Sequence, residues 1–188
     1  MSGRTPKEAW TNYVHPLREA LRCITPGRFV LRQSQAGLQP NVAYSVSLNN
    51  MTSVPLRGPN NLALVAGQTI RIHDWQSTSA SERYSVQMSS YAHAFAIATD
   101  HRDQELLMFH WNHREQSQSS LIPAGHLHVG SILLARPTVI RPDDFHNAHI
   151  PTGPISFPAL VRFAIVELGV TPLVADWESV LAHCDQIP

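Results

Sequence analysis

Three segments with strand-type composition follow one another with only short polar turns between them. They cover Gln68 to Thr78, Glu82 to Thr99 and Glu105 to Trp111. The residues between them are rich in Ser and Thr or in Asp and Arg, and these connections are too short to hold a crossover helix. This spacing favours an antiparallel meander over a parallel sheet.

Further strands are predicted on both sides of the meander. They cover Arg28 to Ser34, Asn41 to Leu48 and Gly125 to Ala135. In the second of these, apolar residues alternate with small polar ones, which is typical of a strand with one buried face. The stretch from Asn49 to Asn61 contains Pro, Gly and paired Asn residues, so we expect a loop there.

Helices are expected at both ends of the chain. Thr5 precedes a proline and a glutamate in the spacing that caps a helix start. An apolar stripe follows, made of Trp10, Val14, Leu17, Leu21 and Ile24. Ser156 is predicted to cap a second helix that stops at Gly169, and a last helix is expected from about Ala175 to His183.

Together these elements predict an α+β fold. An antiparallel β-sheet of five to seven strands would be covered by the N-terminal helix and the C-terminal helices. With 188 residues and 43% hydrophobic composition, the chain is long and apolar enough for one domain with a sizeable core. We expect that domain to consist of an N-terminal helix at 1–27, the sheet at 28–135, a Pro-rich loop at 136–154 and C-terminal helices at 155–188.

Charge and cysteine content limit the surroundings in which the protein can work. The 14 basic residues balance the 14 acidic ones, so any contact with nucleic acid must depend on a local surface. Cys23 and Cys184 form no pattern that suggests a disulfide framework. No apolar stretch reaches the roughly 18 residues of a membrane span, and no signal-peptide core follows Met1. We therefore expect a cytoplasmic protein with reduced thiols and no membrane contact.

Histidines gather in the second half of the chain. Six of the 11 histidines lie within 40 residues, namely His110, His113, His126, His128, His146 and His149. Because His126 and His128 are one residue apart in a strand-like sequence, alternation sends both rings to one sheet face. We expect His149 within reach of them. The structural alternative is a strand end whose imidazoles bond to backbone carbonyls or carboxylates; His110 is expected in the core, and His93 and His113 at the surface.

Such a cluster has two chemical interpretations. A divalent metal such as zinc would need three or four converging ligands, which His126, His128 and His149 could supply together with His146 or Asp144. None of their spacings is a known zinc motif, so a protein without a cofactor is the alternative. Metal-free cleavage of RNA requires a base, an acid and a cation that stabilises the phosphorane. Two histidines with Arg136 or Arg141 meet that requirement.

Five segments between residues 68 and 170 follow one another in a recognisable order. They are Ile70-Arg71-Ile72-His73-Asp74-Trp75, Arg83-Tyr84-Ser85-Val86, Leu106 to Asn112, Pro123 to Val129, and Ile155 to Leu168. Over residues 68–170 this order resembles the TumE-like toxins of bacterial toxin–antitoxin pairs. Here Ala124 and Gly125 separate the proline from the first histidine, and an insertion precedes the last segment. The resemblance implies a small antiparallel sheet flanked by helices that acts on RNA or on a component of translation.

These observations predict a toxin-like protein that acts on RNA through its histidine cluster. As a histidine-dependent ribonuclease, it would use His126, His128, His149 and Arg141 as catalytic residues. Its partners would be an antitoxin protein and RNA. The alternative is a non-enzymatic protein-binding module, in which the histidine patch is structural or holds a metal ion.

Overall fold

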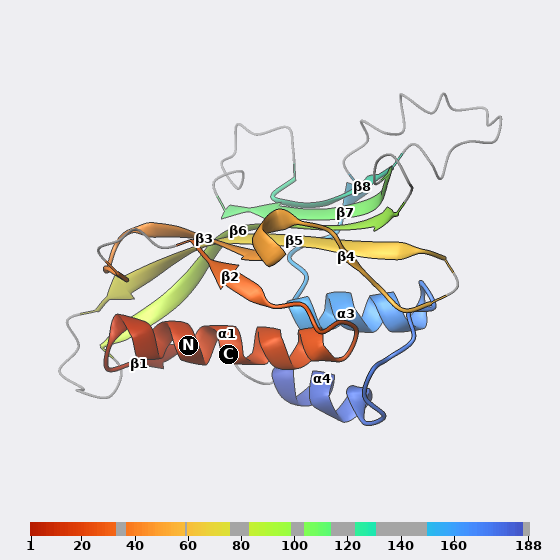
Figure 1. Ribbon diagram of the computed structural model, residues 1–188. Helices are drawn as coiled ribbons and strands as arrows, with labels where there is room; N and C mark the ends of the chain where they lie inside the picture. The colour runs from red at the N-terminus through yellow and green to blue at the C-terminus, as the bar shows by residue number, and fades with distance from the viewer. Residues whose placement is uncertain are drawn as a thin grey trace.

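The computed structural model shows a single layer of sheet with helices along one side (Figure 1). It describes residues 1–32, 37–58, 60–75, 83–98, 104–113, 123–130 and 150–185. Among these residues, all strand pairs are antiparallel. The α+β class expected from the sequence is confirmed.

The described part of the sheet has nine strands, two more than the upper limit expected. They are β1 (Ser2–Gly3), β2 (Phe29–Leu31), β3 (Ala43–Leu48), β4 (Val54–Pro55), β5 (Leu62–Asp74), β6 (Tyr84–Ile97), β7 (Gln104–Asn112), β8 (Gly125–Val129) and β9 (Ile150–Pro151). The main path runs β2-β3-β5-β6-β7-β8-β9, with β1 beside β6 and β4 beside β5. The count exceeds the expectation because β1, β4 and β9 have only two residues each.

The central pair of strands, β5 and β6, differs from the prediction in where β5 begins. β5 begins at Leu62 rather than Gln68, and it pairs with β6 along its whole length, from Leu62 opposite Ile97 to Asp74 opposite Tyr84. The expected loop before it also contains η1 (Asn49–Met51), a 3₁₀ turn, and the short strand β4. Pairing with neighbouring strands therefore extends regular structure into residues that local composition assigns to a loop.

The described residues form three α-helices, all on one side of this sheet (Figure 1). They are α1 (Pro6–Arg22), α3 (Phe157–Val166) and α4 (Trp177–Asp185). The predicted caps are confirmed: the Thr5 side chain accepts a hydrogen bond from the Glu8 amide, and the Ser156 side chain accepts one from Ala159. No helix in the described ranges is long and apolar enough to cross a membrane.

The core lies between the helices and the sheet. Even-numbered residues of β5 such as Leu64 and Ile70 are fully buried there, together with Phe95 of β6. They face Leu21 of α1 and Leu160 of α3, which are also fully buried. Cys23 and Cys184 are free thiols in this layer, and burial raises the pKa of Cys23 to about 11.

Candidate functional site

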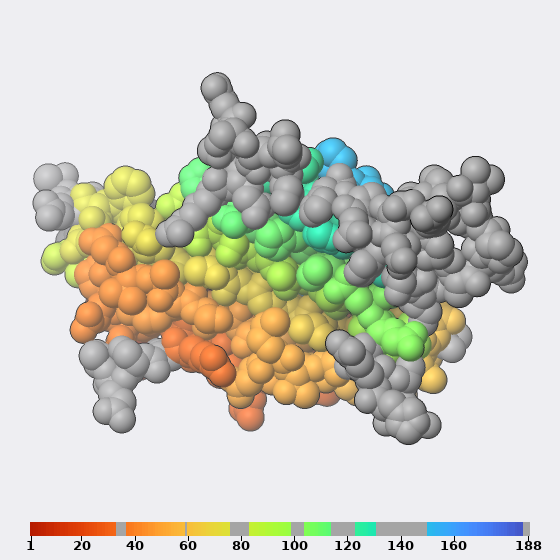
Figure 2. All heavy atoms as spheres, turned by 90° about the horizontal axis from the view of Figure 1, so that it is seen from above, coloured from red at the N-terminus to blue at the C-terminus, as the bar shows by residue number. Residues whose placement is uncertain are grey.

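The sheet has a second face, which no helix of the described residues covers (Figure 1). Alternation along the strands sends the odd-numbered residues of β5 to this helix-free face, since the even-numbered ones are buried against the helices. Figure 2 looks onto the helix-free face, where β3, β5, β6 and β7 lie side by side. Its side chains are largely small or polar, as in Gly67, Thr69, Ser90 and Ala92.

Strand register brings three histidines together on the helix-free face. His110 of β7 lies directly opposite His126 of β8, and His128 lies opposite Met108 in the same pair of strands. The ring centroids of His126 and His110 are 4.9 Å apart, and those of His126 and His128 are 4.8 Å apart. The prediction that His126 and His128 share one face is confirmed. We refer to His110, His126 and His128 as the histidine cluster.

Hydrogen bonds fix the tautomers of two rings in the cluster. The Nδ1 atom of His126 lies 2.6 Å from the carbonyl oxygen of Pro123, which can only accept a hydrogen bond, so Nδ1 of His126 carries the proton. Nε2 of a neutral His126 then accepts, and Nδ1 of His110 donates to it across 3.2 Å. This arrangement places the lone pair of a neutral His110 on its Nε2 atom.

The three rings differ in exposure. His126 is only 2% exposed, whereas His110 and His128 are half-buried. His126 can therefore influence a bound molecule mainly through the residues that it contacts. The rings of His110 and His128 are more accessible to a bound molecule. From the sequence alone, His110 is expected in the core and outside the site, whereas its half-buried ring belongs to the cluster. The cross-strand position opposite His126, which only the register reveals, brings it there.

Two glycines hold β8 close to its neighbours. A Cβ atom on Gly125 would lie 2.5 Å from the backbone of Gly153, and one on Gly130 would lie 1.7 Å from the carbonyl oxygen of Glu105. Side chains do not fit at either distance. The strand that carries His126 and His128 is thus fixed between backbone contacts at both ends.

A hollow of about 200 Å³ lies beside the cluster on the helix-free face and includes His110 in its lining. Gly67 forms part of its floor, and a Cβ atom there would lie 2.9 Å from Sδ of Met51. Met51 is 51% exposed and has a φ of +67°, as the third of three consecutive residues in the left-handed region. A non-glycine residue with this φ is strained, and such strain often occurs at binding sites. The sequence predicts only a loop for this segment.

A second hollow of about 440 Å³ adjoins the first, because Thr69 and Ser90 line both. Among the described residues that line it, Arg71, His73 and His113 are titratable and none is a carboxylate. His113 is exposed, as expected, but it belongs to this lining. In the sequence, only the family resemblance singles out Arg71 and His73. Their spacing of two residues on β5 places both on the same sheet face.

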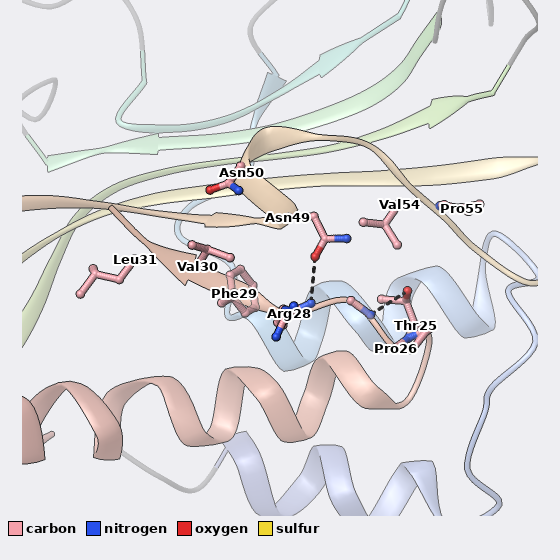
Figure 3. Close-up of a pocket in the computed structure, with 11 residues that line it drawn as sticks. Thr25, Pro26, Arg28, Phe29, Val30, Leu31, Asn49, Asn50, Val54 and Pro55 are labelled. Carbon is pink, nitrogen blue, oxygen red and sulfur yellow. Dashed lines mark hydrogen bonds between the residues drawn. The ribbon is translucent and has the colours of Figure 1, made fainter. Parts of the chain in front are cut away.

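A further hollow of about 1010 Å³ lies at the edge of the sheet, between residues 25–31 and the segment from Asn49 to Pro55 (Figure 3). The Asn49 side chain accepts a hydrogen bond from the Arg28 amide across it, at 3.2 Å. Arg28 is the one ionisable residue in its described lining. Acid–base chemistry needs at least one group that titrates near neutral pH, so this hollow is a poorer candidate than the helix-free face.

Several predicted site residues fall outside the described residues. These are His146, His149 and Arg141, together with the alternatives Arg136 and Asp144. Within the described ranges, no group of three His, Cys, Asp or Glu side chains has the arrangement of a metal site. The His110–His126 hydrogen bond occupies a lone pair that a metal ion would otherwise use.

His93 is not at the surface as expected. It is 1% exposed on the helix side of the sheet, where its ring stacks on Tyr91 at 4.8 Å and contacts the edge of Phe157. Neither ring nitrogen has a hydrogen-bond partner within the described part of the chain. Burial lowers the pKa of His93 to about 3, so the ring stays neutral and packs as an apolar group.

Comparisons with family models, with curated proteins and with solved structures find no match for this chain.

Proposed function

We propose that this protein is a toxin of a toxin–antitoxin pair and that it cleaves RNA with its histidine cluster. The observation that carries the proposal is the hydrogen-bonded His110–His126 pair, with His128 beside it on the helix-free face of the sheet. Two imidazoles within reach of one phosphate can supply the base and the acid that RNA cleavage requires. The TumE-like order of segments supports the toxin assignment.

We assign His110 as the base and His128 as the acid. Nε2 of His110 removes the proton of a ribose 2′-hydroxyl, and the 2′-oxygen forms a bond to phosphorus. The bond from phosphorus to the 5′-oxygen breaks, and protonated His128 gives its proton to that oxygen. The products are a 2′,3′-cyclic phosphate and a 5′-hydroxyl. Arg141 is our candidate for stabilising the charge on the phosphorane.

His126 has a positioning role in this assignment. Its bond to the Pro123 carbonyl and its bond from His110 keep the lone pair of His110 on Nε2. When His110 takes up a proton, the bond to His126 becomes charge-assisted and therefore stronger. Because the reaction needs one neutral and one protonated imidazole, its rate should have a bell-shaped pH dependence.

The test is cleavage of a defined RNA by the purified protein. We expect fragments with cyclic phosphate ends, identified by mass spectrometry, and we expect cleavage to persist in the presence of a strong chelator. His128→Ala should lower the rate by about two to four orders of magnitude. The matched control is His15→Ala, which removes an exposed histidine from α1 on the other side of the molecule. Loss of cleavage with the chelator, restored by zinc, would show that the metal-free mechanism is wrong.

A second candidate function is a protein-binding module with a structural histidine patch. The near-complete burial of His126 and its bond to a backbone carbonyl favour this candidate, because structural histidines have these features too. The two candidates predict different results for the same preparation. A folded parent protein that binds an antitoxin but leaves RNA intact would support the binding module.

A further inference from the structure

We propose that the Arg71 side of the helix-free face binds single-stranded RNA, with Arg71 holding a phosphate and Trp75 stacking on a base. The proposal deepens the proposed function and rests on it for the choice of RNA as substrate. Arg71, His73 and Trp75 follow one another at every second residue on and directly after β5. We call these three residues the β5 platform.

The Arg71 side chain has the features of an anion-binding group. It is half-buried in the hollow of about 440 Å³, and within the described residues it has neither a hydrogen bond nor an ion pair. Arg83, by contrast, is paired with Asp74 at 2.9 Å. A guanidinium that is partly removed from water and lacks a carboxylate is suited to a bidentate contact with a phosphate.

Trp75 supplies a flat apolar surface beside His73, which lines the hollow. It is 65% exposed, which is unusual for tryptophan, and its indole nitrogen donates a hydrogen bond to Ser85 Oγ at 2.5 Å. The neighbouring His73 ring lies 5.9 Å away, tilted by 35°. The ring is therefore held in place by a polar contact while a large part of its surface stays open. A base can stack there only if it is unpaired, which selects a single strand over a duplex.

The charge of the surface also selects a polyanion. The described lining of the two hollows contains Arg71 and three histidines but no Asp or Glu. The protein as a whole has no net charge, so this is a local property of the helix-free face. A strand of RNA carries one negative charge per nucleotide, and Lys and Arg contacts to its phosphates supply most of the sequence-independent affinity.

The distance between the platform and the cluster sets a minimum length for the ligand. Arg71 lies two strands away from His110 and four residues further along the sheet, because Gly67, Ala92 and His110 lie opposite one another. With usual strand spacing this corresponds to roughly 15 Å. One nucleotide cannot bridge that distance. A strand of several nucleotides can lie across Thr69 and Ser90, which line both hollows.

The experiment measures binding separately from cleavage. Fluorescence anisotropy is recorded with a labelled RNA of about 12 nucleotides, a length within the range that single-strand sites cover. All its 2′-hydroxyls are methylated, so that the 2′-oxygen cannot attack. We expect Arg71→Ala to weaken binding at least tenfold and to reduce the salt dependence by about one phosphate contact. Trp75→Ala should weaken binding about 5- to 150-fold, the range that loss of one stacked base produces.

Conservative and matched variants complete the experiment. Arg71→Lys and Trp75→Phe should retain most of the affinity, and Arg18→Ala, which removes an exposed arginine from α1, should have no effect. A duplex of the same sequence should compete poorly. Equal competition by the duplex, or parental affinity in both alanine variants, would overturn the proposal. The proposal would also be overturned if the parent protein does not bind the RNA and a partner polypeptide instead buries Trp75.

The two proposals can fail separately in this design. If the methylated RNA binds through Arg71 and Trp75 but unmodified RNA stays intact, the platform assignment holds and the ribonuclease proposal is wrong. If unmodified RNA is cleaved at the parental rate and bound with parental affinity by both alanine variants, the ribonuclease proposal holds and the platform assignment is wrong.

Discussion

A histidine that is almost completely buried can affect a substrate only through the residues it contacts. His126 has such a position, between the Pro123 carbonyl and the ring of His110. His128 lies two residues further along β8, opposite Met108 of β7, and is more exposed. Substitutions of the two residues can therefore separate the role of orienting His110 from the role of transferring a proton.

We expect His126→Ala and His128→Ala to differ in their effect on stability. Loss of the His126 ring leaves the His110 donor without this acceptor and opens a cavity, so the free energy of unfolding should fall by about 1 to 3 kcal/mol. His128→Ala should change it by less than about 0.5 kcal/mol while lowering activity. Urea unfolding curves, combined with cleavage rates, check both statements. Equal destabilisation by the two variants would contradict the assignment of His126 as the positioning residue.

His93 should make the protein sensitive to acid. Burial holds its pKa at about 3 in the folded protein, whereas in the unfolded chain the ring has its ordinary pKa of 6.5. The unfolded chain therefore binds a proton between these values and the folded protein does not. The resulting stability is complete above about pH 6.5 and falls as the pH decreases toward 3, by about 1.4 kcal/mol per pH unit.

The substitution His93→Phe should remove this part of the pH dependence. Phenylalanine retains the stacking on Tyr91 but cannot take up a proton. Between pH 7 and pH 4, the parent should lose more of its free energy of unfolding than the variant does, as measured by chemical denaturation at each pH. Parallel curves for the two proteins would show that His93 is not the cause. A constant offset between the curves reports only the difference in packing.

At the scale of elements, the position of β8 depends on close backbone contacts at Gly125 and Gly130, and the packing of α1 depends on its apolar stripe. Gly125 lies directly before His126, where the backbone of Gly153 leaves no space for a side chain. Gly67 differs, because the nearest atom to its absent Cβ is the sulfur at the end of the flexible Met51 side chain. The same substitution should therefore have different consequences at the two positions.

We expect Gly125→Ala to destabilise the protein by about 1 to 3 kcal/mol, because backbone must move to relieve the overlap. It should also lower activity, since the movement displaces the start of β8. Gly67→Ala is the control, and rotation of Met51 should limit its cost to less than about 1 kcal/mol. Thermal unfolding of both variants tests the difference. A tolerated Gly125→Ala would mean that β8 is not held by this contact.

Leu17 tests whether α1 belongs to the domain. It is 8% exposed and is part of the core cluster. Leu17→Ala should therefore lower the free energy of unfolding by about 2 to 5 kcal/mol. Val166→Ala, at a site on α3 that is 60% exposed, should change it by less than about 0.5 kcal/mol. Unfolding of the Leu17 variant at the parental midpoint would identify α1 as a detachable arm.

Local sequence patterns predicted most elements because their causes are local. The caps at Thr5 and Ser156 and the alternation in β3 depend on residues within one or two turns of each other. The early start of β5 and the position of His110 opposite His126 depend instead on strand register. Register is determined by packing and by loop geometry across the whole sheet. Histidine pairs could thus be predicted within a strand but not between strands.

At the scale of the whole molecule, stability and proposed function belong to opposite faces of one sheet. The helix side contains the apolar core and the neutral His93, whereas the helix-free face contains the histidine cluster and the β5 platform. Substitutions at half-buried positions on the helix-free face should change function with little effect on stability. Substitutions in the core should have the reverse effect.

The growth of bacteria that express the protein tests this separation in the cell. Expression without an antitoxin should slow growth if the intact chain cleaves RNA, and His128→Ala should relieve the effect while the protein stays folded. His15→Ala should remain as toxic as the parent. Soluble protein levels and thermal unfolding must be measured for each variant, because loss of toxicity through unfolding says nothing about catalysis. A folded His128→Ala protein that still stops growth would exclude His128 as the acid.

A parent protein that does not slow growth at high expression would favour the binding module. A sheet face that only binds a partner protein has no substrate in such cells.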